Sequence, residues 1–452
     1  MLALQCLTQI GGVYLQAFST GDYVVASRIG GLQLFHFEEG VLIPKASLSL
    51  TSIPLLVKPK ESHDIIVVFK KAVFKVCITS EEKLSLCEYH SDSFQYKRPF
   101  DTAQIIKTNK GEFLLDRQNK LVVNLTTKDN LRLPGYSRPS TISLSENGQF
   151  LFVADVGRIH CIKVDDMSFA LGYSAPGWPK DIFVVNDNVF VANVYGISWF
   201  KEVDVYPFLK LHGKIAFPHF RIAKVIACQN NVFACDEARG VHIFAMKDNG
   251  LYPAGGMMCA GGGWDCIFID YDLYIASGNE GWCQIKNYSP DKSLFTPDYK
   301  QKYENERVQA ISFWKQENAI VVLSSGHIRV IQRDDYSELF ELEANAWGGC
   351  EVSNRFLVAT ENGIIALEAN AQKQITLSES IPLTEARDIC YDGIYIWVAS
   401  GKGGIKCFTI ETGRLQYQGT FPVCGFSRGI FATSKRLYVG AGDGGLVAIK
   451  KG

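Results

Sequence analysis

Nine residues that could bind a ligand occupy comparable places in successive segments of the chain, each just before a short apolar strand. They are Trp178, Lys180, Asp181, Trp264, Asp265, Trp347, Arg387, Asp388 and Arg428. Trp faces can stack on planar or apolar groups, Arg can clamp a carboxylate or phosphate, and Asp can take a metal or another cation. Aromatic faces alternating with both charge signs favour a site for a protein, a peptide or a small polar ligand.

The same residues also fit a structural role. Trp side chains can pack between neighbouring repeats, and Asp and Arg can pair across them and tie the repeats together. The residue types do not separate these two interpretations, so both stay open.

The common catalytic and cofactor motifs do not occur in the sequence. There is no H-E-x-x-H, G-x-S-x-G or Walker A pattern, and no C-x-x-C among the 13 Cys. The glycine-rich segments 401–404 and 442–445 lie between strands, so we expect hairpin turns there and no phosphate loop. We therefore predict a non-catalytic protein with no catalytic residue, no metal and no cofactor. The alternative is an enzyme of the lactonase or hydrolase type that uses carboxylates such as Asp181, Asp265 and Asp388, directly or through a metal.

Composition narrows the class of protein. The 452 residues include 46 Lys and Arg against 47 Asp and Glu, and 47% of them are apolar. This balance predicts a folded chain and argues against a nucleic-acid partner. No window is long and apolar enough for a membrane helix, and the N-terminus lacks the basic region of a signal peptide. We expect no membrane insertion, a cytoplasmic location and reduced cysteines.

A repeat of about 41 residues organises the whole chain. Each copy has an apolar strand, a second strand that ends on a small or apolar anchor residue, a turn, a third apolar strand and a polar outer strand. The eleven anchors are Ala26, Phe69, Leu115, Ala154, Ala192, Ala234, Ala276, Leu323, Ala359, Ala399 and Gly440. This period is typical of one four-stranded propeller blade, so the sequence predicts an all-β propeller of about eleven blades.

The last repeat provides only three strands, and an unpaired apolar segment, MLALQCLTQI, begins the chain. An open sheet edge is unfavourable. We therefore predict that the N-terminal strand closes the last blade.

Eleven blades exceed the usual four to eight in one ring. We expect about four blades in residues 1–178 and about seven in residues 179–452, with a single wide ring over 1–452 as the alternative.

The segments 180–197, 387–405 and 428–446 resemble the LVIVD-repeat β-propeller family, whose pattern runs from "xDV" to "YVADxxxGLxIVD". The resemblance implies a propeller fold and no defined activity. The segment 397–419 is similar to a quinoprotein repeat, which would imply a quinone cofactor. Thr409 stands where that family has Asp and no other copy repeats the pattern, so we expect no such cofactor.

Overall fold

The computed structural model describes most of the chain. The described residues are 4–38, 41–50, 54, 56–61, 64–69, 73–90, 104–134, 139–145, 147–170, 173–175, 177–194, 196–204, 207–216, 220–248, 250–289 and 295–451. Strands make up 65% of the structure, and the helical element among the described residues is a short 3₁₀ turn, η2 (Gly442–Gly444). The protein is all-β, as the repeat predicts.

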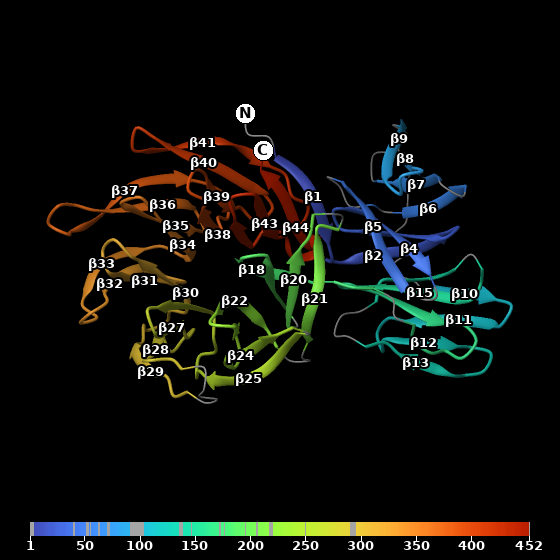
Figure 1. Cartoon of the computed structure of the whole chain (residues 1–452), viewed down its shortest axis with the longest axis horizontal. Helices are drawn as coiled ribbons and strands as arrows, with labels where there is room; N and C mark the ends of the chain where they lie inside the picture. The colour runs from blue at the N-terminus through green and yellow to red at the C-terminus, as the bar shows by residue number, and fades with distance from the viewer. Residues whose placement is uncertain are drawn as a thin grey trace.

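The described strands form eleven four-stranded antiparallel sheets, arranged in two lobes (Figure 1). The first four sheets are β2 (Tyr14–Thr20), β3 (Tyr23–Arg28), β4 (Gly31–Glu38) and β5 (Val41–Ser49); β6 (Leu56–Glu61), β7 (Asp64–Val68), β8 (Val73–Ile78) and β9 (Leu84–His90); β10 (Gln104–Thr108), β11 (Gly111–Asp116), β12 (Leu121–Asn124) and β13 (Asn130–Arg132); and β14 (Thr141–Leu144), β15 (Phe150–Asp155), β16 (Arg158–Lys163) and β17 (Tyr173–Ser174).

Six further sheets follow in chain order. They are β18 (Pro179–Val185), β19 (Asn188–Asn193), β20 (Gly196–Glu202) and β21 (Leu209–Ala216); β22 (Ile222–Cys228), β23 (Asn231–Asp236), β24 (Gly240–Lys247) and β25 (Gly250–Met258); β26 (Asp265–Ile269), β27 (Asp272–Ala276), β28 (Trp282–Ile285) and β29 (Asp298–Gln301); β30 (Val308–Trp314), β31 (Ala319–Ser324), β32 (His327–Gln332) and β33 (Glu338–Glu343); β34 (Ala346–Val352), β35 (Arg355–Thr360), β36 (Gly363–Ala369) and β37 (Ile375–Pro382); and β38 (Asp388–Tyr391), β39 (Ile396–Ala399), β40 (Ile405–Glu411) and β41 (Arg414–Phe421).

The last sheet joins the two ends of the chain. It contains β42 (Gly429–Ala432), β43 (Arg436–Gly440), β44 (Leu446–Lys451) and, at its outer edge, β1 (Leu4–Ile10). Leu4 pairs with Lys451 and Ile10 with Leu446 in antiparallel register. The predicted closure of the last blade by the N-terminal strand is confirmed, and Figure 1 shows β1 beside β44.

Burial explains why each repeat makes one sheet. The second strands are apolar and enclosed on both faces, as in β31, where every residue is buried, whereas the outer strand β37 is mostly exposed. The core therefore lies between neighbouring sheets. One such cluster packs Trp314 and Val330 against Phe356 and Leu367 of the next sheet.

Contacts between innermost strands connect the sheets in sequence. In the larger lobe β18 contacts β22, and the contacts continue through β26, β30, β34 and β38 to β42, which contacts β18 again. These seven sheets form a closed circuit. In the smaller lobe β14 contacts both β10 and β2, and β2 contacts β6.

The chain passes between the lobes at two adjacent places. After β1 it turns at Gly12, and the Val13 N–H donates to the Asp443 carbonyl at 2.9 Å. The second passage leads from β17 to β18: there the Ala175 N–H donates to the Gly157 carbonyl at 2.7 Å, and the Gly157 N–H, in the turn between β15 and β16, donates to the Gly12 carbonyl at 2.7 Å. Gly12 has φ +82°, and a Cβ there would lie 2.4 Å from the Asp443 oxygen, so the crossing requires glycine.

The cysteines differ in part from the expected reduced state. Ten described cysteines are free thiols, most of them buried, whereas Cys77 in β8 is disulfide-bonded. Its position inside an apolar strand gave no sign of this bond. Among the described residues, no helix is long and apolar enough to cross a membrane.

Candidate functional site

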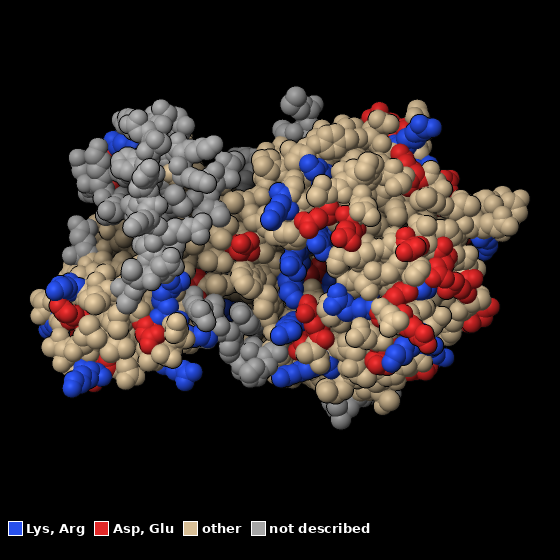
Figure 2. Space-filling model, turned by 180° about the vertical axis from the view of Figure 1, so that it is seen from behind, with Lys and Arg blue, Asp and Glu red and all other residues tan. Residues whose placement is uncertain are grey.

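The closed circuit of seven sheets surrounds a central cavity of about 160 Å³, which we call the channel pocket. Eight of the nine predicted site residues line it: Lys180, Asp181, Trp264, Asp265, Trp347, Arg387, Asp388 and Arg428. Trp178, 40% exposed, lines an adjoining cavity of about 410 Å³ that shares Lys180 and Arg428 with the channel pocket. On the face drawn in Figure 2, Lys and Arg side chains alternate with Asp and Glu around a central hollow.

The strand boundaries differ from the prediction that all nine residues precede a strand. Trp178, Trp264, Arg387 and Arg428 do lie before the innermost strand of their sheet, but the other five lie inside it, at or near its first residue. Four strands of the circuit have an irregular register at this end: the pairing skips Lys180, Ala223, Gln309 and Trp347. A β-bulge turns the extra residue out of the regular pairing.

Each sheet contributes two consecutive residues at the same place. The second residue of each pair faces the end of the next strand: Asp181 opposite Ala192, Lys224 opposite Cys235, Asp265 opposite Ala276, Ala310 opposite Leu323, Gly348 opposite Ala359, Asp388 opposite Ala399 and Gly429 opposite Gly440. The first residues are Lys180, Ala223, Trp264, Gln309, Trp347, Arg387 and Arg428. The propeller repeat therefore explains how residues far apart in sequence meet at one channel.

Sequence reasoning missed three polar residues of the pocket: Lys224, Glu237 and Gln309. Lys224 pairs with Cys235, one residue beyond the predicted anchor Ala234, so the anchor was placed one residue early in this repeat. Aligning NVFVAN with NVFACD would have placed Lys224 at the position of Asp181. Gln309 precedes Ala310 in the same way, and its position alone would have found it.

The three channel carboxylates hold neighbouring sheets together. Asp181 Oδ2 accepts the Val225 N–H at 3.0 Å, Asp265 Oδ2 accepts the Ile311 N–H at 3.1 Å, and Asp388 Oδ2 accepts the Ile430 N–H at 2.9 Å. In each case the N–H belongs to the innermost strand of the following sheet. The other oxygen of Asp265 accepts the N–H of Cys266, and the other oxygen of Asp388 accepts the N–H of Ile389. In both cases the donor is the next residue of the same strand.

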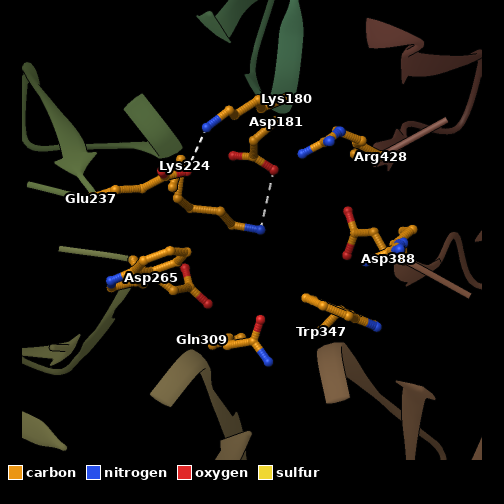
Figure 3. A pocket seen from close by; sticks show the side chains of 14 residues that line it. Lys180, Asp181, Lys224, Glu237, Asp265, Gln309, Trp347, Asp388 and Arg428 are labelled. Carbon is orange, nitrogen blue, oxygen red and sulfur yellow. Dashed lines mark hydrogen bonds and ion pairs between the residues drawn. The ribbon is translucent and has the colours of Figure 1, made fainter. Parts of the chain in front are cut away.

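Lys224 is the cation among these carboxylates, as Figure 3 shows. Its Nζ lies 3.2 Å from Asp181 Oδ1. Burial disfavours the Lys224 ammonium, but the three carboxylates outweigh burial and hold its pKa well above the ordinary value. Burial raises the pKa of Asp265 and of Asp388 to about 6, with Lys224 opposing the shift.

The cations at the mouth of the pocket stack on aromatic rings. The Arg387 guanidinium carbon lies 4.3 Å from the Trp347 ring centroid and 5.3 Å from that of Phe426, and Arg428 lies 5.4 Å from the Phe426 centroid. The guanidinium carbon of Arg307, which directly precedes β30 of the next sheet, lies 4.3 Å from the centroid of the Trp264 ring. These contacts give the aromatic residues a role between sheets, in addition to lining the channel.

The mouth cations differ in their ion pairs. Lys180 pairs with Glu237, and Arg387 Nη2 lies 3.3 Å from Glu385 Oε1. Arg428 forms no ion pair with any residue that the structure describes. Burial, together with the nearby Arg387 charge, lowers its pKa. Arg428 is therefore the mouth cation whose charge is least compensated.

The donor atoms set limits on the chemistry of the site. Among the described residues, no group of three or more His, Cys, Asp and Glu is placed to hold a metal ion. Both oxygens of Asp265 and Asp388 already accept backbone N–H groups, which leaves them suited to electrostatic attraction and additional hydrogen bonds.

The fold defines the chain as a β-propeller protein. No protein-family profile and no curated protein sequence matches the chain. Among solved structures it is similar to the extracellular domain of a hybrid two-component system from B. thetaiotaomicron, with 11% identity and a TM-score of 0.48, over 96% of this chain and 69% of that one. It is also similar to the WD40 domain of Pan2 from Neurospora crassa, with 9% identity and a TM-score of 0.47, over 61% of this chain and 89% of that one.

Proposed function

We propose that the protein is a non-catalytic propeller module that binds a protein, a peptide or a small polar ligand at the mouth of the channel pocket. The observation that carries this proposal is the exposed Arg428 guanidinium, which forms no ion pair with the described residues and lies beside aromatic walls and charges of both signs. An exposed guanidinium without an ion pair is available to form charge-assisted hydrogen bonds with a carboxylate or carbonyl group of a ligand. Nine of the fourteen residues that line the pocket are charged or polar, which favours a polar ligand.

The carboxylates favour binding over catalysis. A carboxylate oxygen that accepts one backbone N–H can still accept a hydrogen bond from a ligand, but such bonds stabilise the carboxylate and make it a weaker base and nucleophile. In Asp265 and Asp388 each oxygen already accepts a backbone N–H, and Asp181 is paired with Lys224. No observation favours the lactonase or hydrolase alternative.

We propose that the chain forms two propellers, with four sheets in the first and seven in the second. The contact of β14 with β2 and that of β42 with β18 support this division over a single wide ring. β1 belongs with the second propeller because it pairs with β44, so the first propeller is inserted between β1 and β18.

The LVIVD resemblance and a cytoplasmic location also remain proposals. The turns and anchors of the segments 180–197, 387–405 and 428–446 support the resemblance. Ten free thiols support a reducing compartment, and the disulfide at Cys77 weighs against it.

Site-specific photocrosslinking tests the proposed function. A photoreactive phenylalanine analogue in place of Trp178 should capture a partner from lysate, and Arg428→Ala should abolish the captured species. The matched control places the analogue at Tyr271, which is 68% exposed at the far end of β26 and should not capture that species. If the captured species persists at full yield with Arg428→Ala, the channel mouth is not the binding site.

A further inference from the structure

We propose that the floor of the channel pocket receives a protonated primary amine from the ligand, held by Asp265, Gln309 and Asp388. This inference rests on the proposed function and names the chemical group that the site recognises. A lysine side chain of a peptide or a free alkylamine can supply the group.

On the floor of the pocket, negatively charged side chains outnumber positively charged ones. Asp181, Asp265 and Asp388 come together from three different sheets, with Lys224 as the cation among them. The Lys224 ammonium lies within ion-pair distance of Asp181, and the described contacts include no ion pair for Asp265 or Asp388. Buried carboxylates are normally compensated by a cation, so Asp265 and Asp388 leave the floor short of positive charge.

Gln309 provides an independent sign of a missing donor. Its side chain is 7% exposed, and its Nε2 donates to Asn345 Oδ1 at 3.0 Å. Asn345 Nδ2 in turn donates to Glu361 Oε2 at 3.2 Å. An ionised carboxylate can only accept, so Glu361 fixes the orientation of Asn345, which fixes that of Gln309.

This relay determines which atom of Gln309 faces the ligand. With Nε2 held by Asn345, the Oε1 atom is directed into the channel, and Figure 3 shows the oxygen turned toward the space beside Lys224. No hydrogen bond to this oxygen is present among the described residues. The residue is largely buried, but this oxygen is accessible from the channel, so a donor group of a ligand can reach it.

The three acceptors match an ammonium group. An alkylammonium carries three N–H donors and no acceptor. Figure 3 shows Asp265, Gln309 and Asp388 around the same space, with the Trp347 ring beside it. Anions are disfavoured beside these three groups because Asp265 and Asp388 are carboxylates and Gln309 presents its oxygen, while the Lys224 ammonium lies next to Asp181.

The size of the pocket is consistent with an aminoalkyl chain. A water molecule occupies roughly 30 Å³ of liquid, so about 160 Å³ holds roughly five atoms of that size. A lysine side chain beyond Cα has about five heavy atoms. Above it, Arg428 would meet a carboxylate or carbonyl of the same ligand.

Calorimetric titration of the full chain at pH 8 tests the proposal. The probe is the peptide acetyl-Gly-Lys-Gly-amide, and its matched neutral control has norleucine in place of lysine. We expect the lysine peptide to bind at least tenfold more tightly than the norleucine peptide. Gln309→Met should weaken the lysine peptide by about tenfold, because a hydrogen bond to a charged group is lost. Gln316→Met makes the same change at the exposed turn that follows β30 and should leave binding unchanged.

Cadaverine, titrated in parallel, separates the two sources of the amine. Tighter binding of the peptide identifies a protein or peptide ligand, and tighter binding of cadaverine identifies a small amine. Equal affinity for the lysine and norleucine peptides would overturn the proposal, as would no binding of either ammonium probe or an unchanged affinity in Gln309→Met. A captured partner at Trp178 together with such a result would leave the proposed function standing and remove only the amine site.

Discussion

Asp388 Oδ2 accepts the backbone N–H of Ile430 at 2.9 Å, across the boundary between two sheets. Asp181 and Asp265 make the equivalent bond to Val225 and Ile311. The carboxylates that line the channel therefore also connect the innermost strands around it. Because the same groups serve binding and architecture, a test of either role must control for the other.

Removing residues 1–10 should destabilise the protein. The truncation exposes the edge of β44, with its apolar residues and unpaired backbone groups. We expect the melting temperature to fall by about 2 °C or more, which corresponds to roughly 2 kcal/mol in a chain of this size. A synthetic peptide of residues 1–10 added in trans should restore it. An unchanged melting temperature after truncation would contradict a stabilising role for β1.

Gly12→Ala should disturb the crossing between the lobes. The new Cβ would lie 2.4 Å from the Asp443 carbonyl oxygen, at a residue with φ +82°. We expect a loss of about 2 kcal/mol or more in the free energy of unfolding. Gly21→Ala is the matched control: φ is +56°, but no atom lies within 4 Å of the new Cβ, so its cost should be about 1 kcal/mol. Similar losses in a urea titration of both variants would show that close contact at Gly12 does not matter.

Arg387→Ala should lower stability even without ligand. The guanidinium stacks on Trp347 and Phe426, and such contacts contribute about 0.5–2 kcal/mol. Arg414 in the outer strand β41 is exposed, so Arg414→Ala should change the free energy of unfolding by less than about 0.5 kcal/mol. If the two variants unfold at the same urea concentration, the stacking contributes nothing to the connection between sheets.

Stability should decrease as the pH rises from 5 to 7.5. The pKa values of Asp265 and Asp388 are raised by burial to about 6, so the folded state binds protons that the unfolded state has released. This contribution is complete below the ordinary carboxyl pKa and is lost as the pH rises through about 6, by a few kcal/mol in total. Glu306 acts in the opposite direction at lower pH, because its Arg329 partner holds its pKa at about 2.

The double variant Asp265→Asn/Asp388→Asn isolates this contribution. Its free energy of unfolding should vary much less between pH 5 and 7.5 than that of the wild-type protein. An equally steep dependence in the double variant would assign the effect to other groups.

The repeat made much of the architecture predictable, because the alternation of apolar strands and turns depends on local sequence. The anchors at Ala192, Ala276 and Ala399 all lie opposite a channel residue, which is why eight of the nine predicted residues line the channel pocket. The β-bulges were not predictable in this way, since they depend on pairing between strands. For the same reason, the orientation of Gln309 requires Asn345 and Glu361, which lie in or beside later sheets.

Proton release on binding tests the account's central claim, which is that the floor of the channel pocket binds a cation next to its carboxylates. The charged groups that face this space are Asp181, Lys224, Asp265 and Asp388 on the floor, and Lys180, Glu237, Arg387 and Arg428 at the mouth. An arriving ammonium lowers the pKa of Asp265 and Asp388, which are about half protonated at pH 6, whereas an alkylammonium remains charged up to about pH 10.

The measurement is the titration of acetyl-Gly-Lys-Gly-amide at pH 6 and pH 8, each in two buffers of different ionisation enthalpy. The account predicts release of up to about one proton per peptide at pH 6, almost none at pH 8, and tighter binding at pH 8. Binding heats that do not depend on the buffer at pH 6, or proton uptake, would contradict it.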